Sequence, residues 1–257
     1  MKTAFLTIAI SMLLMMSADS IHAQTGWNIG IQPGPSTNLS IFDKGDEEAS
    51  ALFGNNMFHG GQISLLSKYH FTEKKAIETG IILSQFGFSY GLSKNYSLKK
   101  AFERNEEIKT EIGLITIPAM AVIHTRRNCS NVRFVFGIGA AIQFIENIQD
   151  ESKYSSTKTD ENGNARTSVL TANTSTTEQL SGSLIWKIGI EKLLKKGGAL
   201  TFTYTGNQGL NKVAESEVTY NSDGNEYRHQ FINRASFVNL AIGYQFRNFG
   251  SKKSIEK

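Results

Sequence analysis

The sequence predicts an all-β protein: an eight-stranded antiparallel transmembrane up-and-down β-barrel, preceded by a cleaved signal peptide. Three observations lead to this prediction. The N-terminus has the layout of a secretory signal, apolar residues recur at every second position in eight later segments, and the links between these segments are alternately short and long. An even number of strands with this alternation of links is typical of bacterial outer-membrane barrels.

Residues 1–23 are predicted to be the signal peptide. Lys2 provides a positive charge, residues 4–18 are largely apolar, and Ala23 supplies the small residue before the cleavage site. The apolar run is too short for a helix that spans a membrane, which needs about 20 residues. An uncleaved N-terminal anchor is the alternative.

The rest of the chain has the length and composition of one large all-β domain. About 234 residues remain after the signal, and none of their apolar stretches approaches the length of a spanning helix. The net charge of +4 is too small and too dispersed to indicate nucleic-acid binding. Cys129 is the only cysteine, so no intrachain disulfide is expected. We expect a barrel domain over residues 24–249 and a short periplasmic tail over residues 250–257.

The first four predicted strands are residues 27–32, 62–70, 77–84 and 108–122. Successive side chains of a strand point to opposite faces, so the alternation assigns each residue to one face. In the fourth strand it leads us to place Glu111 on the polar inner face. Four aliphatic residues of that strand are then expected on the outer face: Ile112, Leu114, Met120 and Val122.

The fifth predicted strand, residues 132–144, has the clearest alternation, and residues 183–191, 200–205 and 238–246 complete the set. Each sets bulky apolar residues against Gly, Thr, Asn, Gln or charged residues. The alternation alone does not say which face is the inner one. The signal peptide and the link lengths favour an apolar exterior in contact with outer-membrane lipid. A soluble lipocalin-like barrel, whose apolar face points inward to a ligand, is the alternative.

The links predict the orientation of the barrel. The short links are Thr72–Lys75, Thr125–Asn131 and Lys195–Gly198, and the long ones are residues 36–58, 91–106, 148–179 and 214–229. Outer-membrane barrels have short periplasmic turns and long external loops, so we expect an outer-membrane protein with both termini in the periplasm. The link 148–179 is rich in Ser, Thr and Asn, and we expect it to be flexible and exposed.

Aromatic residues lie near the ends of the predicted strands. Tyr and Trp favour the interfaces between membrane and water. We expect an aromatic girdle made of Trp27, Tyr69, Phe71, Phe86, Phe88, Tyr244 and Phe246.

Six charged residues are assigned to the inward face, three of each sign and all near short links. They are Lys68, Glu78, Glu111, Arg133, Lys187 and Glu191. Buried charges are costly unless they are paired, and an eight-stranded barrel has room for side chains but not for an open channel. We therefore expect an ion-pair network that closes the lumen. The alternative is that some of these side chains extend to the periplasmic rim without pairing.

Four segments resemble the PorT-like outer-membrane barrels of Bacteroidota. These are the Ile-Pro strand Leu114–Met120, the glycine-rich strand Val132–Ala141, the end of strand seven from Tyr204 to Gly209-Leu210, and the closing strand Ala241–Phe246. The chain departs from the family in continuing from Arg247 to Lys257 after the closing strand. The resemblance implies the barrel fold. The name-giving member of the family is implied in protein export by the type IX route, and that role is not carried over to this chain.

No catalytic constellation, metal site or cofactor site is predicted. We expect a non-enzymatic outer-membrane barrel, a closed scaffold whose long loops serve envelope or surface interactions. The alternatives are an accessory component of a type IX-like export apparatus and a small lipid-acting barrel enzyme. For the last, His59 and Ser236 lie near strand ends. The expected partners are outer-membrane lipid, the barrel-assembly machinery during biogenesis, and an envelope protein of unknown identity, but no nucleic acid.

Overall fold

A computed structural model of the chain describes residues 26–39, 41–44, 53–57, 59–92, 107–128, 130–159, 165–194, 198–222 and 225–249. The predicted signal peptide and the predicted C-terminal tail lie outside these residues. Within the described ranges, no helix is long and apolar enough to cross a membrane.

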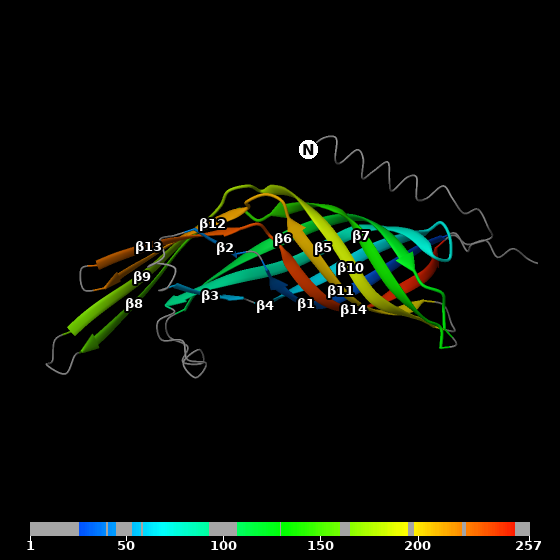
Figure 1. Cartoon of the computed structure of the whole chain (residues 1–257), viewed down its shortest axis with the longest axis horizontal. Coiled ribbons are helices and arrows are strands. Elements are labelled where there is room, and N and C mark those ends of the chain that lie inside the picture. Colours follow the sequence, from blue (N-terminus) through cyan, green and yellow to red (C-terminus); the bar gives the residue numbers. More distant parts are fainter. Residues whose placement is uncertain are drawn as a thin grey trace, which may run out of the picture.

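Eight long strands form a closed antiparallel barrel (Figure 1). They are β1 (Gly26–Asn38), β4 (His59–His70), β5 (Lys75–Leu92), β6 (Glu107–His124), β7 (Val132–Ile145), β10 (Leu180–Leu193), β11 (Ala199–Gly209) and β14 (Phe237–Phe249). Each pairs with the next along the chain, and β14 pairs with β1 to close the barrel. The predicted eight-stranded barrel is thus confirmed, and each predicted segment lies within one of these strands.

The three short links lie at one end of the barrel, which we call the short-turn end. They join β4 to β5, β6 to β7 and β10 to β11. The first residue of β1, Gly26, pairs with His70, and the last residue of β14, Phe249, pairs with Trp27. The outer ends of β1 and β14 therefore lie at the short-turn end too. We call the opposite end the long-loop end.

A second sheet extends beyond the long-loop end, at the left of Figure 1. Its strands are β2 (Ile41–Lys44), β8 (Gln149–Thr159), β9 (Ala165–Thr176), β12 (Ala214–Ser222) and β13 (Asn225–Asn233), in the order β2-β13-β12-β9-β8. We call this five-stranded sheet the outer sheet. A further strand, β3 (Phe53–Met57), is not part of it and pairs with the end of β5.

The outer sheet corrects the expectation that residues 148–179 are a flexible loop, because this link folds as the β8–β9 hairpin. Threonine and serine suit strands when they meet cross-strand partners. Thr174 on β9 shares a hydrogen bond of 2.8 Å with Ser216 on β12. The same hairpin buries Leu170 and Ala172 in an apolar cluster with Val218. These contacts join segments far apart in the sequence.

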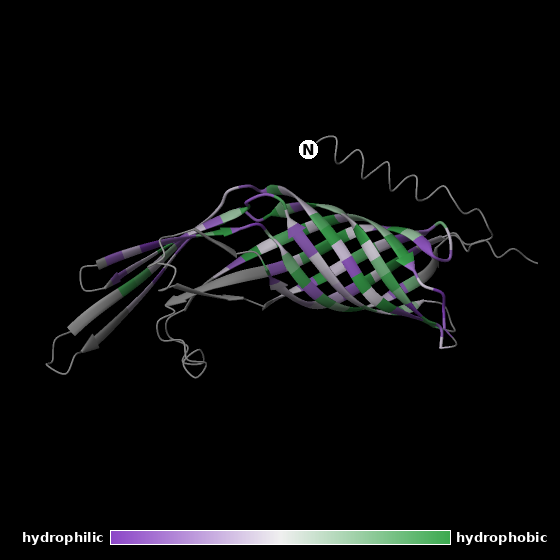
Figure 2. Ribbon diagram, in the orientation of Figure 1, coloured by the Kyte–Doolittle hydropathy of each residue, from purple (hydrophilic) through white to green (hydrophobic). Residues whose placement is uncertain are grey.

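Hydrophobic and hydrophilic residues alternate along the barrel strands (Figure 2), and the large apolar side chains are the exposed ones. Ile138 and Ile242 are about two-thirds exposed, at 66% and 65%, as only side chains on the outer face of a barrel can be. Their strand neighbours Gly139 and Ala241 are buried. The predicted apolar exterior is therefore observed in the closed barrel.

Strand β6 is the exception, because its predicted faces are reversed. Ile112, Leu114, Met120 and Val122 are buried inside the barrel, whereas Ile115, Ile117 and Ile123 are exposed outside. Both faces of this strand carry aliphatic residues, so alternation alone could not orient it. The register with β5 and β7 does so instead.

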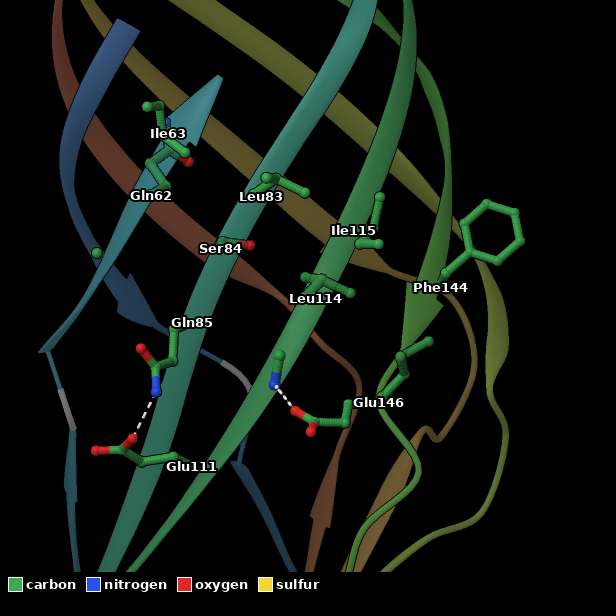
Figure 3. Close-up of a pocket in the computed structure, with 13 residues that line it drawn as sticks. Gln62, Ile63, Leu83, Ser84, Gln85, Glu111, Leu114, Ile115, Phe144 and Glu146 are labelled. Atoms are coloured by element: carbon green, nitrogen blue, oxygen red, sulfur yellow. Dashed lines mark hydrogen bonds between the residues drawn. The ribbon is translucent and has the colours of Figure 1, made fainter. Parts of the chain in front are cut away.

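Glu111 consequently lies on the outer face, near the long-loop end (Figure 3). It accepts a hydrogen bond of 2.5 Å from the amide of Gln85. The prediction that Glu111 belongs to the luminal charge network is therefore wrong.

Candidate functional site

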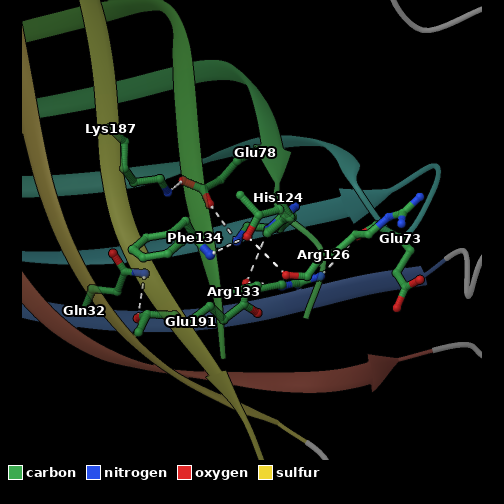
Figure 4. A network of polar contacts seen from close by, with 12 residues as sticks. Gln32, Glu73, Glu78, His124, Arg126, Arg133, Phe134, Lys187 and Glu191 are labelled. Atoms are coloured by element: carbon green, nitrogen blue, oxygen red, sulfur yellow. Dashed lines mark hydrogen bonds and ion pairs between the residues drawn. The ribbon is translucent and has the colours of Figure 1, made fainter. Parts of the chain in front are cut away.

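The other five predicted luminal charges are buried together in the short-turn half of the barrel, and Figure 4 labels four of them: Glu78, Arg133, Lys187 and Glu191. The strand register explains two of their contacts. Lys68 on β4 lies directly opposite Glu78 on β5, and their charged atoms are 3.5 Å apart. Arg133 on β7 lies opposite Glu191 on β10, and two guanidinium nitrogens reach Glu191 Oε2 at 2.9 and 3.0 Å.

Two further side chains join these pairs across the lumen. Lys187 on β10 donates from Nζ to Glu78 Oε1, so a single carboxylate receives two lysines. The amide of Gln245 on β14, oriented to suit its neighbours, donates to Glu191 Oε1 at 3.3 Å and accepts from Lys68 Nζ at 3.1 Å. The result is one connected network across the lumen, which we call the luminal network.

Two histidines border the luminal network and were not predicted as part of it. His124 Nε2 lies 3.3 Å from Glu191 Oε2, and the rings of His70 and His124 have centroids 5.1 Å apart. The inward position of His70 follows from the alternation of its strand. His124 was missed because its strand was oriented the wrong way round.

The charges of the luminal network do not balance. Without Glu111, three cations (Lys68, Arg133 and Lys187) face two carboxylates. All five side chains are at most 2% exposed. An unpaired buried charge would cost several kcal/mol. The burial is tolerated here because each carboxylate contacts at least two donors. Arg133 also donates to the backbone oxygen of Glu73 at 3.1 Å, which places its guanidinium at the short-turn rim.

Apolar and uncharged polar side chains share the interior of the barrel beyond the luminal network. One cluster consists of Leu66, Ala76, Ile82, Met120, Val122, Val135, Ala141 and Ile185. A second cluster, around Ile112, Leu114, Ile145 and Phe237, continues from the barrel into the outer sheet. The residues before β14 close over the mouth, where the carbonyl oxygen of Ala235 accepts hydrogen bonds from Gln143 and Asn207 on the barrel wall.

The aromatic residues predicted as a girdle occupy the two ends of the barrel. Five of them gather at the short-turn end: Trp27, Tyr69, Phe71, Tyr244 and Phe246. Within this group, the ring centroids of Trp27 and Tyr69 are 5.0 Å apart, and those of Tyr244 and Phe246 are 4.8 Å apart. The backbones of Phe86 and Phe88 lie in the long-loop half of β5, but their side chains are outside the described part of the structure.

The residues considered for an enzyme do not form a catalytic pair in the part of the chain that is described. Ser236 is buried, and its hydroxyl accepts a hydrogen bond of 2.9 Å from the backbone nitrogen of Gly209. The side chain of His59 lies outside the described residues. Among described side chains, no group of three or more His, Cys, Asp or Glu residues could hold a metal ion.

Comparison with known proteins gives one family and several similar structures. The family model described as outer membrane protein beta-barrel domain matches residues 22–215. The solved structures include OprG from Pseudomonas aeruginosa, with 14% identity, a TM-score of 0.49, and coverage of 89% of this chain and 100% of that chain. Neisserial surface protein A shows 12% identity, a TM-score of 0.44, and coverage of 87% and 97%.

Ail of Yersinia pestis, in complex with the heparin analogue sucrose octasulfate, shows 12% identity and a TM-score of 0.35, with coverage of 86% of this chain and 99% of that chain. No curated protein matches this chain. These matches do not test the resemblance to PorT-like barrels, which stays a prediction.

Proposed function

Since the chain belongs to the outer membrane protein β-barrel domain family, we propose that it is a closed, non-conducting scaffold that presents its outer sheet to a partner at the cell surface. In this arrangement the short-turn end and both termini face the periplasm. The outer sheet, at the opposite end, faces the outside, as the long loops of outer-membrane barrels do. The basic and polar short turns, where Arg127 pairs with Glu73 at 2.8 Å, then lie on the periplasmic side.

The observation that carries the proposal is the filled lumen. Charged side chains at most 2% exposed span the barrel near the short-turn end, and apolar clusters together with buried uncharged polar side chains occupy the interior beyond them. A water-filled pore would leave its lining charges hydrated instead. The long links between barrel strands form a five-stranded sheet beyond the barrel. One face of that sheet carries Glu151, Asn173 and Glu217 side by side across three paired strands.

Electrical recording tests the closed lumen. Purified protein inserted into planar bilayers is expected to give no large, steady conductance. A stable conductance in the unaltered protein would overturn the proposal of a closed scaffold.

Chemical cross-linking in native envelopes tests the role of the outer sheet. A variant in which a short turn replaces the β8–β9 hairpin, residues 149–176, is expected to lose cross-links that the full-length protein forms. The control exchanges Glu73 for Gln at the opposite end and is expected to keep them. Unchanged cross-links after removal of the hairpin would contradict a role for the outer sheet.

A further inference from the structure

A recess of about 810 Å³ opens on the outer face of the barrel near the long-loop end (Figure 3). Its wall includes apolar residues that also face outward from the barrel: Ile63, Leu83, Ile115 and Phe144. This volume is within the range of about 300–1,000 Å³ that small-molecule sites occupy. The recess lies outside the luminal network and is independent of the proposed scaffold function.

The recess forms where two strand ladders end. The pairing of β4 with β5 stops at Gln62 and Ser84, and the pairing of β6 with β7 stops at Leu114 and Ile145. Past these pairs β5 and β6 stay paired with each other, and the backbone nitrogen of Glu146 still donates to the carbonyl oxygen of Gly113 at 3.0 Å, but the two ladders that flank them have ended. The recess is therefore lined by inward-facing, buried residues, such as Ser84 and Leu114, as well as by outward-facing ones.

Two carboxylates lie at the recess, and backbone or amide donors position each of them. Glu111 accepts from Gln85 Nε2 at 2.5 Å, and Glu146 accepts from the backbone nitrogen of Gly113 at 2.9 Å. A Cβ atom at position 113 would lie only 2.7 Å from Glu146 Oε2, so the glycine leaves the space that this carboxylate occupies. No hydrogen bond from a described residue reaches the second oxygen of either carboxylate.

A buried hydroxyl supplies an independent indication of a ligand. Ser84 lines the recess and is only 7% exposed, yet among the described residues its Oγ has no hydrogen-bond partner. Buried hydroxyl groups are normally satisfied, and an unsatisfied one calls for a missing partner. A polar atom of a ligand inside the recess would provide that partner.

We propose that the recess binds a single-chain amphiphile with a cationic head group. The hydrocarbon chain lies against Ile63, Leu83 and Phe144, and the head group lies at Glu111 and Glu146. The charge decides the class of ligand, because two carboxylates beside an apolar, lipid-facing wall attract a cation and repel an anion. Carboxylates on that face are tolerated near the membrane interface, where the cost of a charge falls to about 0–1 kcal/mol.

Electron paramagnetic resonance in phosphatidylcholine nanodiscs tests the proposal. The probes are a spin-labelled long-chain primary alkylammonium, whose N–H groups can donate to a hydroxyl and to carboxylates, and a spin-labelled carboxylate of equal chain length. The full-length protein is expected to immobilise the ammonium probe with about tenfold higher affinity, equivalent to about 1.4 kcal/mol. Equal affinity for the two probes would overturn the proposal.

Two variants separate the head-group contacts from the shape of the recess. The double variant Glu111→Gln, Glu146→Gln is expected to lose the preference for the ammonium probe. Gly61→Phe is expected to abolish binding of that probe, because Gly61 lines the recess and a Cβ there would meet no atom within 4 Å. Affinity like that of the unaltered protein in Gly61→Phe would overturn the assignment to this recess. A preference that persists in the double variant would overturn the role of the carboxylates.

A matched control removes two exposed carboxylates elsewhere, with Glu73→Gln and Glu151→Gln. It is expected to keep the preference for the ammonium probe. The different gel mobility of heated and unheated protein reports that each variant has folded.

Discussion

Glu78 is the carboxylate on which two buried lysines depend, so its removal is the sharpest test of the luminal network. It contacts Lys187, and its other oxygen lies 3.5 Å from Lys68. All three side chains are at most 2% exposed. Glu78→Gln keeps the shape of the side chain but leaves both ammonium groups without their carboxylate. Breaking a buried pair in this way costs about 3–5 kcal/mol.

Removal of a lysine is expected to cost much less than removal of the carboxylate. The lysine and arginine side chains of the luminal network supply three cations, and its glutamates supply two carboxylates. Lys187→Met therefore balances the charges, and Glu78 keeps Lys68 as its partner. A hydrophobic residue of similar volume in place of a buried charge is often close to neutral, so we expect a cost of at most about 1–2 kcal/mol.

The assay is urea unfolding in phospholipid vesicles, followed by tryptophan fluorescence, with free energies from linear extrapolation. Glu73→Gln is the control, since its pair with Arg127 is largely exposed and contributes about 0–1 kcal/mol. The reasoning is refuted if Lys187→Met destabilises the barrel as much as Glu78→Gln does. It is also refuted if Glu78→Gln costs no more than Glu73→Gln.

Three further predictions address the membrane position, the mouth and the outer sheet. In the variant Trp186→Phe, the remaining Trp27 at the short-turn end is expected to be quenched best by lipids brominated near the head group, and equal quenching by deeply brominated lipid would contradict an interfacial position. Ser236→Ala removes the acceptor of the Gly209 N–H and is expected to lower the free energy of unfolding by about 1–3 kcal/mol in the same urea assay; no change would show that this bond is dispensable. Val218→Asp buries a charge at a fully buried site of the outer sheet. The β12–β13 hairpin is therefore expected to become sensitive to protease, while the gel shift of the folded barrel persists. Loss of the gel shift together with protease sensitivity would show that the outer sheet and the barrel unfold together.

The barrel could be predicted from the sequence because the evidence for each of its strands lies within a short segment. Alternating side chains identify a strand within a few residues. The links separate one strand from the next, so the number of strands can be read from the sequence. Thus the segment around Phe134 and Phe136 could be assigned to a strand with an apolar outer face without knowledge of its neighbours. The inward positions of Lys68, Glu78 and Glu191 followed in the same way.

Alternation could not predict the inner face of a strand that carries apolar residues on both faces. Strand β6 has Ile112 and Leu114 on one face and Ile115 and Ile117 on the other, so only its register with β5 and β7 could decide which side faces inward. That one error assigned Glu111 to the lumen, whereas the residue lies on the outer face at the recess. The strands of the outer sheet were missed for a related reason, because their polar Ser and Thr residues become strand-forming only beside their cross-strand partners.

The number of barrel strands, their order and most of the faces they present could thus be predicted from the sequence, since these depend on neighbours in the chain. Which charges meet depends on the closed barrel. Lys187 reaches Glu78 across the lumen, and Gln245 connects Glu191 with Lys68, because closing the barrel fixes the stagger of strands that are not neighbours in the sequence. Contacts of this kind depend on the closed register of all eight strands, which no single segment contains.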